Sequence, residues 1–252
     1  MAGGDTRKLH IRHGLARVLS KQGVCSRSEA ERRIRDGRVT LDGRVIRDPE
    51  CPASMSQHVI LIDGMALQPI ARIYIMLNKP RGLVTTIADE RQRDTVYRCF
   101  DGADLPWIAP VGRLDKASEG LLLFCNDPAW AAAITSPATG PDKTYHVQVD
   151  AIPDAELLAR VMLGIDIGGE RLTAKSATLL RAGQKNAWLE LVLEEGRNRQ
   201  IRRLLAACDI AVLRLVRVAI GSVQLGVLGK GAWRMLDADE VRALCPMTQG
   251  DS

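Results

Sequence analysis

The sequence has few aromatic residues, no paired cysteine motif and no apolar run long enough to cross a membrane. Its 252 residues include only three Tyr and two Phe, and none of the six cysteines forms a Cys-x-x-Cys pair. The four histidines show no metal-ligand spacing, so we predict no metal site. No N-terminal segment has the form of a signal peptide. These absences predict a cytoplasmic protein whose cysteines are reduced.

Positive charge is concentrated near the N-terminus. The whole chain carries a formal net charge of +5. Residues 7–47 contain twelve Lys or Arg and four Asp or Glu, an excess of eight positive charges. Because solvated surfaces usually mix both signs, this segment predicts an anionic partner such as nucleic acid. The alternative is a basic helix pair that only faces solvent.

The first 70 residues predict a small module of two helices and two hairpins. Residues 1–11 look like a flexible basic leader, and apolar residues at helical spacing follow, up to Gly23. Ser26 and Glu29 form a capping-box pattern at the start of a second helix that ends at Gly37. Two Asp-Gly pairs, at 42–43 and 63–64, each predict a tight hairpin turn.

This order of elements resembles the S4 RNA-binding domain. The matching residues are 17–20, 23–30 and 37–43, and we expect the domain to cover residues 12–72. The resemblance implies a role in binding RNA but does not define a reaction. Under this hypothesis the RNA-contacting side chains are Arg17, Arg27, Arg32, Arg33 and Arg35.

A single carboxylate near the middle of the chain stands out. Asp115 lies in a Gly-Arg-Leu-Asp turn, five residues before Gly120, and a continuous apolar run follows. Such a run predicts a buried strand, which would hold Asp115 on a loop at the edge of a rigid core. An Asp that pairs with Arg113 only to order the turn is the alternative interpretation.

From residue 73 onward the pattern predicts an α+β domain on a mixed, largely antiparallel sheet. We expect this domain to end near residue 240 and residues 241–252 to form a disordered tail. The expected strands are 73–77, 121–124, 145–149, 189–193 and a last one that includes Leu225, Val227 and Leu228, and the expected helix is 129–134.

Four segments of the chain from residue 73 onward resemble pseudouridine synthases that modify ribosomal RNA. They are residues 77–82, the Asp115 loop, residues 143–147 and residues 195–204, in the family's order. The resemblance implies isomerisation of uridine to pseudouridine in ribosomal RNA by a monomer without a cofactor. This reaction breaks a glycosidic C–N bond and rejoins the uracil through carbon, with no net redox change.

The resemblance also assigns the site residues. Asp115 would be the nucleophile or base, Arg202 its guanidinium partner, and Tyr145 the ring that stacks on an extruded uracil. Arg203 is the nearest competitor of Arg202 for that role. Further cations would contact RNA phosphates, namely Lys79, Arg81, Arg113, Lys143, Arg197, Arg199 and Arg203.

Two other classes of protein carry S4 modules. A non-catalytic RNA-binding or ribosome-assembly protein would explain the basic N-terminus but not the Asp115 pattern. An aminoacyl-tRNA synthetase would require a nucleotide-binding signature, and the sequence has neither a Gly-rich nucleotide loop nor HIGH or KMSKS motifs.

Overall fold

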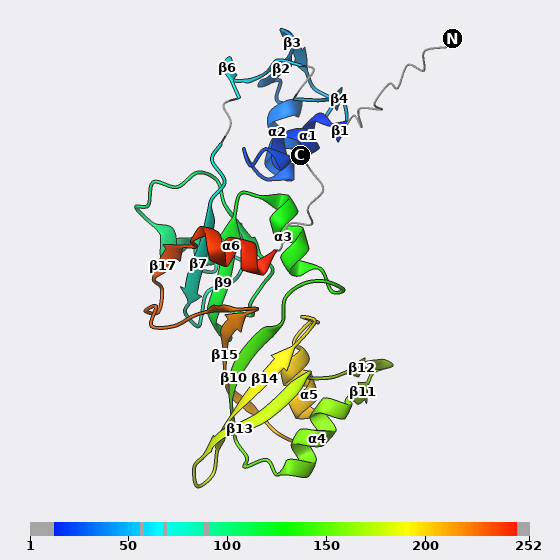
Figure 1. The fold of residues 1–252 in the computed structure, drawn as a ribbon. Helices are drawn as coiled ribbons and strands as arrows, with labels where there is room; N and C mark the ends of the chain where they lie inside the picture. The colour runs from blue at the N-terminus through cyan, green and yellow to red at the C-terminus, as the bar shows by residue number, and fades with distance from the viewer. Residues whose placement is uncertain (1–12, 56–57, 68–69, 88–90, 246–252) are drawn as a thin grey trace, which may run out of the picture. The chain divides into compact units, whose positions relative to one another are not determined.

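The computed structural model describes residues 13–55, 58–67, 70–87 and 91–245. It separates into two compact units, each described here by itself (Figure 1). The first unit holds the chain up to Arg72, with the segments Leu105–Ile108 and Asn126–Pro128, and the second holds the remainder from Ile73. The main chain passes from the first unit to the second between Arg72 and Ile73. The predicted flexible leader lies outside the described residues.

The first unit is two helices beside a small sheet. Its core contains Leu15, Leu19, Ala30 and Ile34, each with no exposed surface. The elements, in chain order, are β1 (His13–Gly14), α1 (Leu15–Lys21), α2 (Arg27–Arg35), β2 (Val39–Leu41), β3 (Arg44–Ile46), β4 (Pro52–Ala53), β5 (Ile60–Ile62) and β6 (Met65–Ala66).

Both predicted hairpins are confirmed. β2 and β3 pair with Leu41 opposite Arg44, and the intervening Asp42 and Gly43 have φ of 50° and 80°. A two-residue turn with positive φ at both positions matches the twist of the flanking strands. β5 and β6 repeat this geometry around an Asp-Gly pair with φ of 51° and 80°.

The predicted capping box of α2 is only half right. The side chain of Ser26 accepts a hydrogen bond from the backbone N–H of Glu29 at 3.1 Å, as expected. The Glu29 carboxylate does not reach back, because it is bound to Arg32 at 2.6 Å and Arg33 at 2.8 Å. The Glu29 carboxylate therefore binds the charged side chains of Arg32 and Arg33 on the next turn of the helix and not the backbone N–H of Ser26.

The second unit is built on a mixed sheet. Neighbouring strands follow the order β13-β14-β10-β15-β9-β7-β17, with β8 on β9 and β16 on β15. The elements are β7 (Tyr74–Lys79), η1 (Val96–Phe100), β8 (Ala109–Val111), β9 (Glu119–Cys125), α3 (Pro128–Thr135), β10 (Lys143–Val149), α4 (Ala155–Leu163), β11 (Ile165–Ile167), β12 (Glu170–Leu172), β13 (Ser176–Ala182), β14 (Ala187–Leu193), α5 (Gln200–Ala206), β15 (Val212–Ile220), β16 (Val223–Gln224), β17 (Trp233–Met235) and α6 (Ala238–Leu244).

The sheet confirms the predicted α+β architecture with a largely antiparallel sheet. Among the strands described, β9 and β15 form the only parallel pair, with Val216 opposite Glu119. Every residue of β9 is buried, whereas buried and partly exposed residues alternate along β10 and β14. α4 and α5 contact β13 and β15 respectively (Figure 1). β9 is therefore the central strand that holds the Asp115 loop.

Two predictions for the C-terminal part were wrong. Leu225, Val227 and Leu228 lie outside the strands, and the last strand is β17. The predicted tail includes residues 241–244, but these belong to α6, which begins at a capping box between Asp237 and Glu240. Leu244 is only 3% exposed and packs in a hydrophobic cluster, so the helix is part of the core. Residues 246–252 lie outside the described chain.

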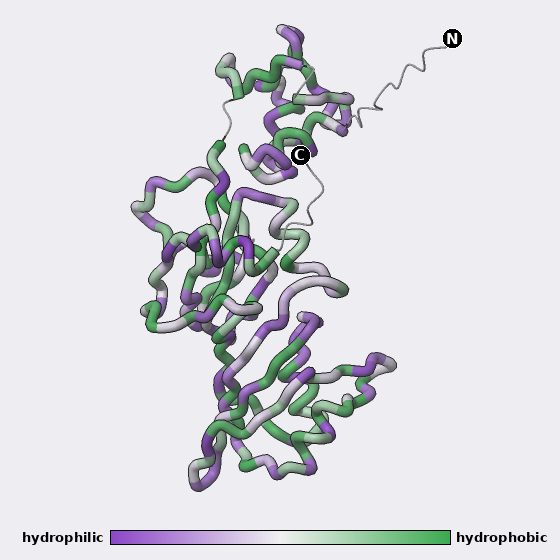
Figure 2. The backbone as a smooth tube through the Cα atoms, in the orientation of Figure 1, coloured by the Kyte–Doolittle hydropathy of each residue, from purple (hydrophilic) through white to green (hydrophobic). Residues whose placement is uncertain are grey.

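Hydrophobic residues are distributed along the fold and not gathered in one long segment. Figure 2 shows hydrophobic and hydrophilic stretches interspersed along the strands and helices of each unit. Within the described ranges, no helix has both the length and the apolar character that crossing a membrane requires.

Candidate active site

The Asp115 loop joins β8 to β9 and is fixed by its backbone. The N–H of Ser118 donates to the carbonyl of Asp115 at 3.0 Å and closes a turn. The Thr85 hydroxyl donates to the Leu114 carbonyl at 2.8 Å and accepts from the Leu114 N–H at 3.3 Å. Leu114 itself is 6% exposed. The loop is anchored on both sides of Asp115, and the Asp115 side chain remains 35% exposed.

The Lys79 side chain is hydrogen-bonded to the backbone of this loop. Its Nζ donates to the carbonyls of Pro80 at 3.1 Å, Asp115 at 3.2 Å and Ser118 at 2.9 Å. The side chain has no exposed surface, and burial lowers the pKa of Lys79 to about 8. The predicted phosphate contact at Lys79 is wrong, because a fully buried amine cannot reach an RNA backbone.

Gly120 permits the close pairing of β9 with β15. Its φ is +100°, and a Cβ at this position would lie 2.2 Å from the carbonyl oxygen of Arg217. No L side chain fits at that distance from backbone atoms. The glycine five residues after Asp115 is therefore required by the parallel pairing itself.

Asp115 opens onto a cavity of about 620 Å³. The three predicted catalytic residues, Asp115, Tyr145 and Arg202, all line it, and Tyr145 is 8% exposed on β10. Four of the predicted phosphate contacts line the same cavity, namely Arg113, Lys143, Arg197 and Arg199. Arg81, which is exposed, and Arg203 do not line it. The cavity is large enough for a nucleoside.

A second recess, of about 640 Å³, lies against the same loop. Asp115 and Arg199 line both spaces. The second recess adds Arg93 and Lys116, which the sequence analysis did not select. Arg93 and Lys116 therefore add two cations to a space that Asp115 lines and Tyr145 does not.

The guanidinium nearest to Asp115 is not the predicted one. Arg199 Nη1 lies 3.7 Å from Asp115 Oδ2. Arg202 instead donates to the carbonyls of Val212 at 3.2 Å and Ala117 at 3.4 Å. Burial and the neighbouring Arg199 charge lower the pKa of Arg202, while Asp115 acts in the opposite direction. Arg202 therefore holds the backbone of the Asp115 loop, and Arg199 forms the ion pair.

Two residues of β15 and β10 add positive charge to the cavity wall. Arg217 is only 5% exposed, and its Nε donates to the Leu121 carbonyl at 2.7 Å. Lys143 donates to the Glu194 carbonyl at 3.3 Å, and burial, with a contribution from Arg217, lowers the pKa of Lys143. Arg217 was not among the residues selected from the sequence.

Glu119 fixes the other end of the Asp115 loop. It is 3% exposed and accepts two hydrogen bonds from Arg214, at 2.7 and 3.1 Å, while Lys230 lies 2.8 Å away. Burial acts to raise the pKa of Glu119, but the bonds from Arg214 and Lys230 outweigh it and lower the pKa. The first residue of β9 is thus anchored by two cations.

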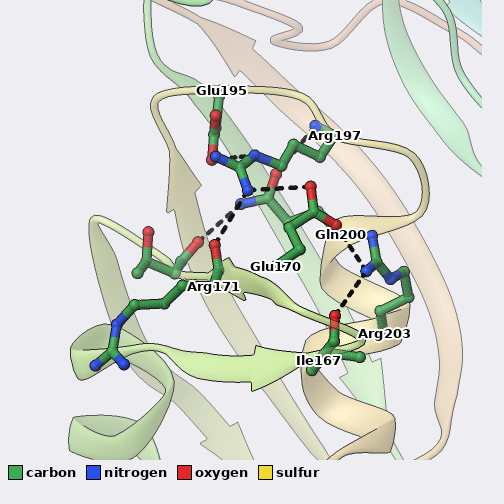
Figure 3. A network of polar contacts seen from close by, with 8 residues as sticks. Ile167, Glu170, Arg171, Glu195, Arg197, Gln200 and Arg203 are labelled. Carbon is green, nitrogen blue, oxygen red and sulfur yellow. Dashed lines mark hydrogen bonds and ion pairs between the residues drawn. The ribbon is translucent and has the colours of Figure 1, made fainter.

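A polar network around the β11–β12 hairpin forms part of the cavity wall, which includes Glu170, Glu195 and Arg197 (Figure 3). Arg197 pairs with Glu195 at 2.7 Å and with Glu170 at 3.0 Å, and Arg203 pairs with Glu170 at 2.7 Å. Arg197 and Arg203 were predicted to contact RNA phosphates. Their guanidinium groups instead bind carboxylates of this unit.

The basic helix α2 of the first unit also carries internal ion pairs. Arg27 and Arg35 both pair with Glu31, and Arg27 also pairs with Glu50. Arg32 and Arg33 share Glu29, and Arg17 on α1 is exposed. The predicted RNA-binding arginines therefore keep part of their surface, with their charge partly compensated.

Groups that could hold a metal ion were searched for in the described residues. No cluster of three or more His, Cys, Asp or Glu side chains with suitable geometry occurs there. All six cysteines are free, and Cys25 and Cys125 are buried.

Comparison with known proteins assigns a class to this arrangement. A family model described as RNA pseudouridylate synthase matches residues 73–207, and an S4 domain model matches residues 14–56. The chain therefore belongs to the RNA pseudouridine synthase family, and it is an isomerase with an N-terminal S4 domain.

Relatives along most of the chain agree with this membership. An uncharacterised RNA pseudouridine synthase of Rickettsia conorii is 36% identical over 89% of this chain and 96% of its own length. The ribosomal large subunit pseudouridine synthase B of Bacillus subtilis is 34% identical over 91% and 94%. A crystal structure of a pseudouridylate synthase, 31% identical, covers 93% of this chain and 99% of its own, with a TM-score of 0.65.

Proposed function

We propose that this enzyme converts uridine to pseudouridine at a specific position of ribosomal RNA, with Asp115 as nucleophile or base. The single observation that carries the proposal is the cavity that brings the Asp115 carboxylate and the Tyr145 side chain to one space. The ribosomal substrate is supported by the similarity to the Bacillus subtilis enzyme and by the basic S4 domain. A location in the cytoplasm fits the six free thiols, and we propose that the enzyme acts as a monomer.

The reaction indicates a role for several residues that line the cavity. Asp115 attacks the sugar or the base, or removes a sugar proton, while the C–N bond breaks and the uracil turns. A C–C bond then forms at C5, the C5 proton is lost, and N1 gains a proton. Arg199 places a positive charge 3.7 Å from the Asp115 carboxylate. Tyr145 provides the face on which the extruded uracil stacks. Arg113 and Arg199, with Arg93 and Lys116 in the second recess, are placed to bind flanking phosphates.

The experiment uses unmodified transcripts. We would incubate the enzyme with large-subunit ribosomal RNA, small-subunit ribosomal RNA and a transfer RNA pool, and map pseudouridine by carbodiimide modification and primer extension. The proposal predicts one or a few new sites in one ribosomal RNA and none in the transfer RNA. Modification of transfer RNA alone would contradict the ribosomal substrate while leaving the enzyme class intact.

A further inference from the structure

The backbone of Arg199 has an uncommon conformation for a residue other than glycine. Its φ is 49° and its ψ is 33°, in the left-handed region, at the residue preceding α5. A branched or long side chain occupies this region at a cost of order 1 kcal/mol, so surrounding contacts must hold it there. This conformation accompanies the placement of the Arg199 guanidinium 3.7 Å from Asp115.

One carboxylate binds the chain on both sides of Arg199. Oε1 of Glu170 accepts from Arg197 at 3.0 Å, and Oε2 accepts from Arg203 at 2.7 Å (Figure 3). Arg197 lies two residues before Arg199, and Arg203 lies one helical turn after it, where its N–H donates to the Arg199 carbonyl at 2.9 Å. Hydrogen bonds from Arg203 and Arg197 lower the pKa of Glu170, so it is charged at neutral pH.

The residues around this carboxylate are themselves tied to the β11–β12 segment. Arg197 Nη1 donates to the Arg171 carbonyl at 3.2 Å. Gln200, only 3% exposed, accepts from the Arg197 N–H at 3.1 Å and donates to the Thr173 carbonyl at 2.9 Å. Leu172, with no exposed surface, anchors β12 in the core. Arg199, with a side chain that is 52% exposed, therefore lies between two tethered residues, Arg197 and Gln200.

We propose that Glu170 is a positioning residue for the Asp115–Arg199 pair. By holding Arg197 and Arg203 it maintains the left-handed backbone that directs the Arg199 guanidinium toward the reacting carboxylate. The inference rests on the proposed role of Asp115. It also assigns Arg197 and Arg203 to the support of this loop, where the sequence analysis had assigned them to RNA.

The test is a double-mutant cycle between Glu170→Gln and Arg199→Met in the full-length enzyme. Single-turnover rates are measured at saturating concentrations of whichever RNA the transcript experiment identifies as substrate. Glu170→Gln keeps the side-chain shape but removes the charge. We expect it to lower the rate roughly tenfold, the size that the loss of one charge-assisted hydrogen bond can produce, with little change in KM. In the Arg199→Met background it should have almost no further effect.

A matched variant controls for charge and for folding. Asp166→Asn removes the same charge from the same hairpin, where Asp166 pairs with Arg171, 3.0 Å away, with both side chains largely exposed. It should leave the rate unchanged, and thermal unfolding should show all variants folded. Glu170→Asp, which is too short to reach both arginines, should give an intermediate rate.

Three results would overturn the proposal. One is an equal rate loss from Glu170→Gln with and without Arg199. Another is an equal loss from Asp166→Asn. The third is an unchanged rate with tighter RNA binding, which would show that Glu170 only competes with RNA for Arg197 and Arg203. None of these results bears on whether Asp115 is essential, so the two proposals fail separately.

Discussion

At the scale of single residues, the site is organised by how each arginine is bound. Three arginines within the same ten-residue stretch have three different tasks: Arg199 faces Asp115, Arg202 binds loop carbonyls and Arg203 binds Glu170. Their partners, and not their burial, separate them, because the Arg199 and Arg203 side chains are 52% and 32% exposed and Arg202 is partly buried. The division predicts different consequences of mutation.

Arg199→Met should lower the rate about tenfold or more and leave thermal stability nearly unchanged, because the side chain is 52% exposed. Arg202→Met should lower stability by roughly 1–3 kcal/mol, because the carbonyls of Ala117 and Val212 lose their donor. Single-turnover rates and urea unfolding of both variants test this. Normal turnover in Arg199→Met would contradict the assignment of the ion pair.

Asp115 and Tyr145 could be selected from the sequence, but the partner of Asp115 could not. The Gly-Arg-Leu-Asp turn and the following apolar strand are local signals, and the structure places them as expected. The choice among Arg199, Arg202 and Arg203 depends on the left-handed backbone at 199 and on Glu170, about thirty residues earlier in the chain. No local pattern encodes that contact.

Lys79 predicts a pH dependence of stability. Its pKa is about 8 in the folded chain and 10.5 ordinarily, so between these values the unfolded chain binds more protons. The contribution of Lys79 to the free energy of unfolding should therefore rise with pH across that window, by up to roughly 3 kcal/mol. Urea unfolding at pH 7.5, 9 and 10 should show that the free energy of unfolding of the wild type exceeds that of Lys79→Met by an amount that grows with pH.

The control for this prediction is Lys185→Met, at an exposed position. The free energy of unfolding of this variant should differ from that of the wild type by an amount that does not depend on pH. A pH-independent difference for Lys79→Met as well would mean that the amine is no harder to charge in the folded chain than in the unfolded one.

At the scale of elements, periodicity and turn chemistry predicted the helices and hairpins of the first unit and four strands and α3 of the second, but not β13, β15, α4 or α5. The buried run of β9, the alternation along β10 and β14, and both Asp-Gly hairpins are local features and were found. α6 was missed because proline and glycine near the C-terminus were interpreted as a tail. Its stability comes from the Asp237 cap and from burial of Leu244, a tertiary contact.

The close pairing of β9 with β15 predicts that Gly120→Ala strongly destabilises the fold. The added Cβ would meet the Arg217 carbonyl oxygen at 2.2 Å, so the two strands must separate. Gly82→Ala is the matched control, because Gly82 has a φ of +102° and open space around it. In urea unfolding, Gly120→Ala should lower the free energy of unfolding by about 3 kcal/mol more than Gly82→Ala does. Equal costs would show that backbone conformation alone, and not the close strand approach, requires glycine there.

At the scale of the whole molecule, the residues proposed for chemistry and the largest excess of positive charge lie in different units. The proposed catalytic residues all lie in the unit that begins at Ile73, while the excess of positive charge lies in the S4 unit. Ion pairs with Glu29 and Glu31 compensate part of that charge. RNA affinity should therefore depend on salt, but less steeply than a count of arginines implies.

Changing Arg32, Arg33 and Arg35 together to Gln should lower the slope of log K against log salt by about 1–3 and leave the single-turnover rate at saturating RNA unchanged. The charge-matched control changes Arg98, Arg181 and Arg242, which do not line the cavity around Asp115. Filter-binding titrations at several salt concentrations test both variants. An unchanged slope in the first variant would mean that α2 does not contact the substrate RNA.

The most direct test of the role of Asp115 is the single-turnover rate of Asp115→Asn, measured together with its RNA affinity and thermal stability. The amide preserves shape but is neither nucleophile nor base, and the Asp115 side chain does not support the core. We predict no detectable pseudouridine with RNA affinity and thermal unfolding close to those of the wild type. Turnover near the wild-type rate in a folded, RNA-binding Asp115→Asn enzyme would contradict the assignment of the catalytic site.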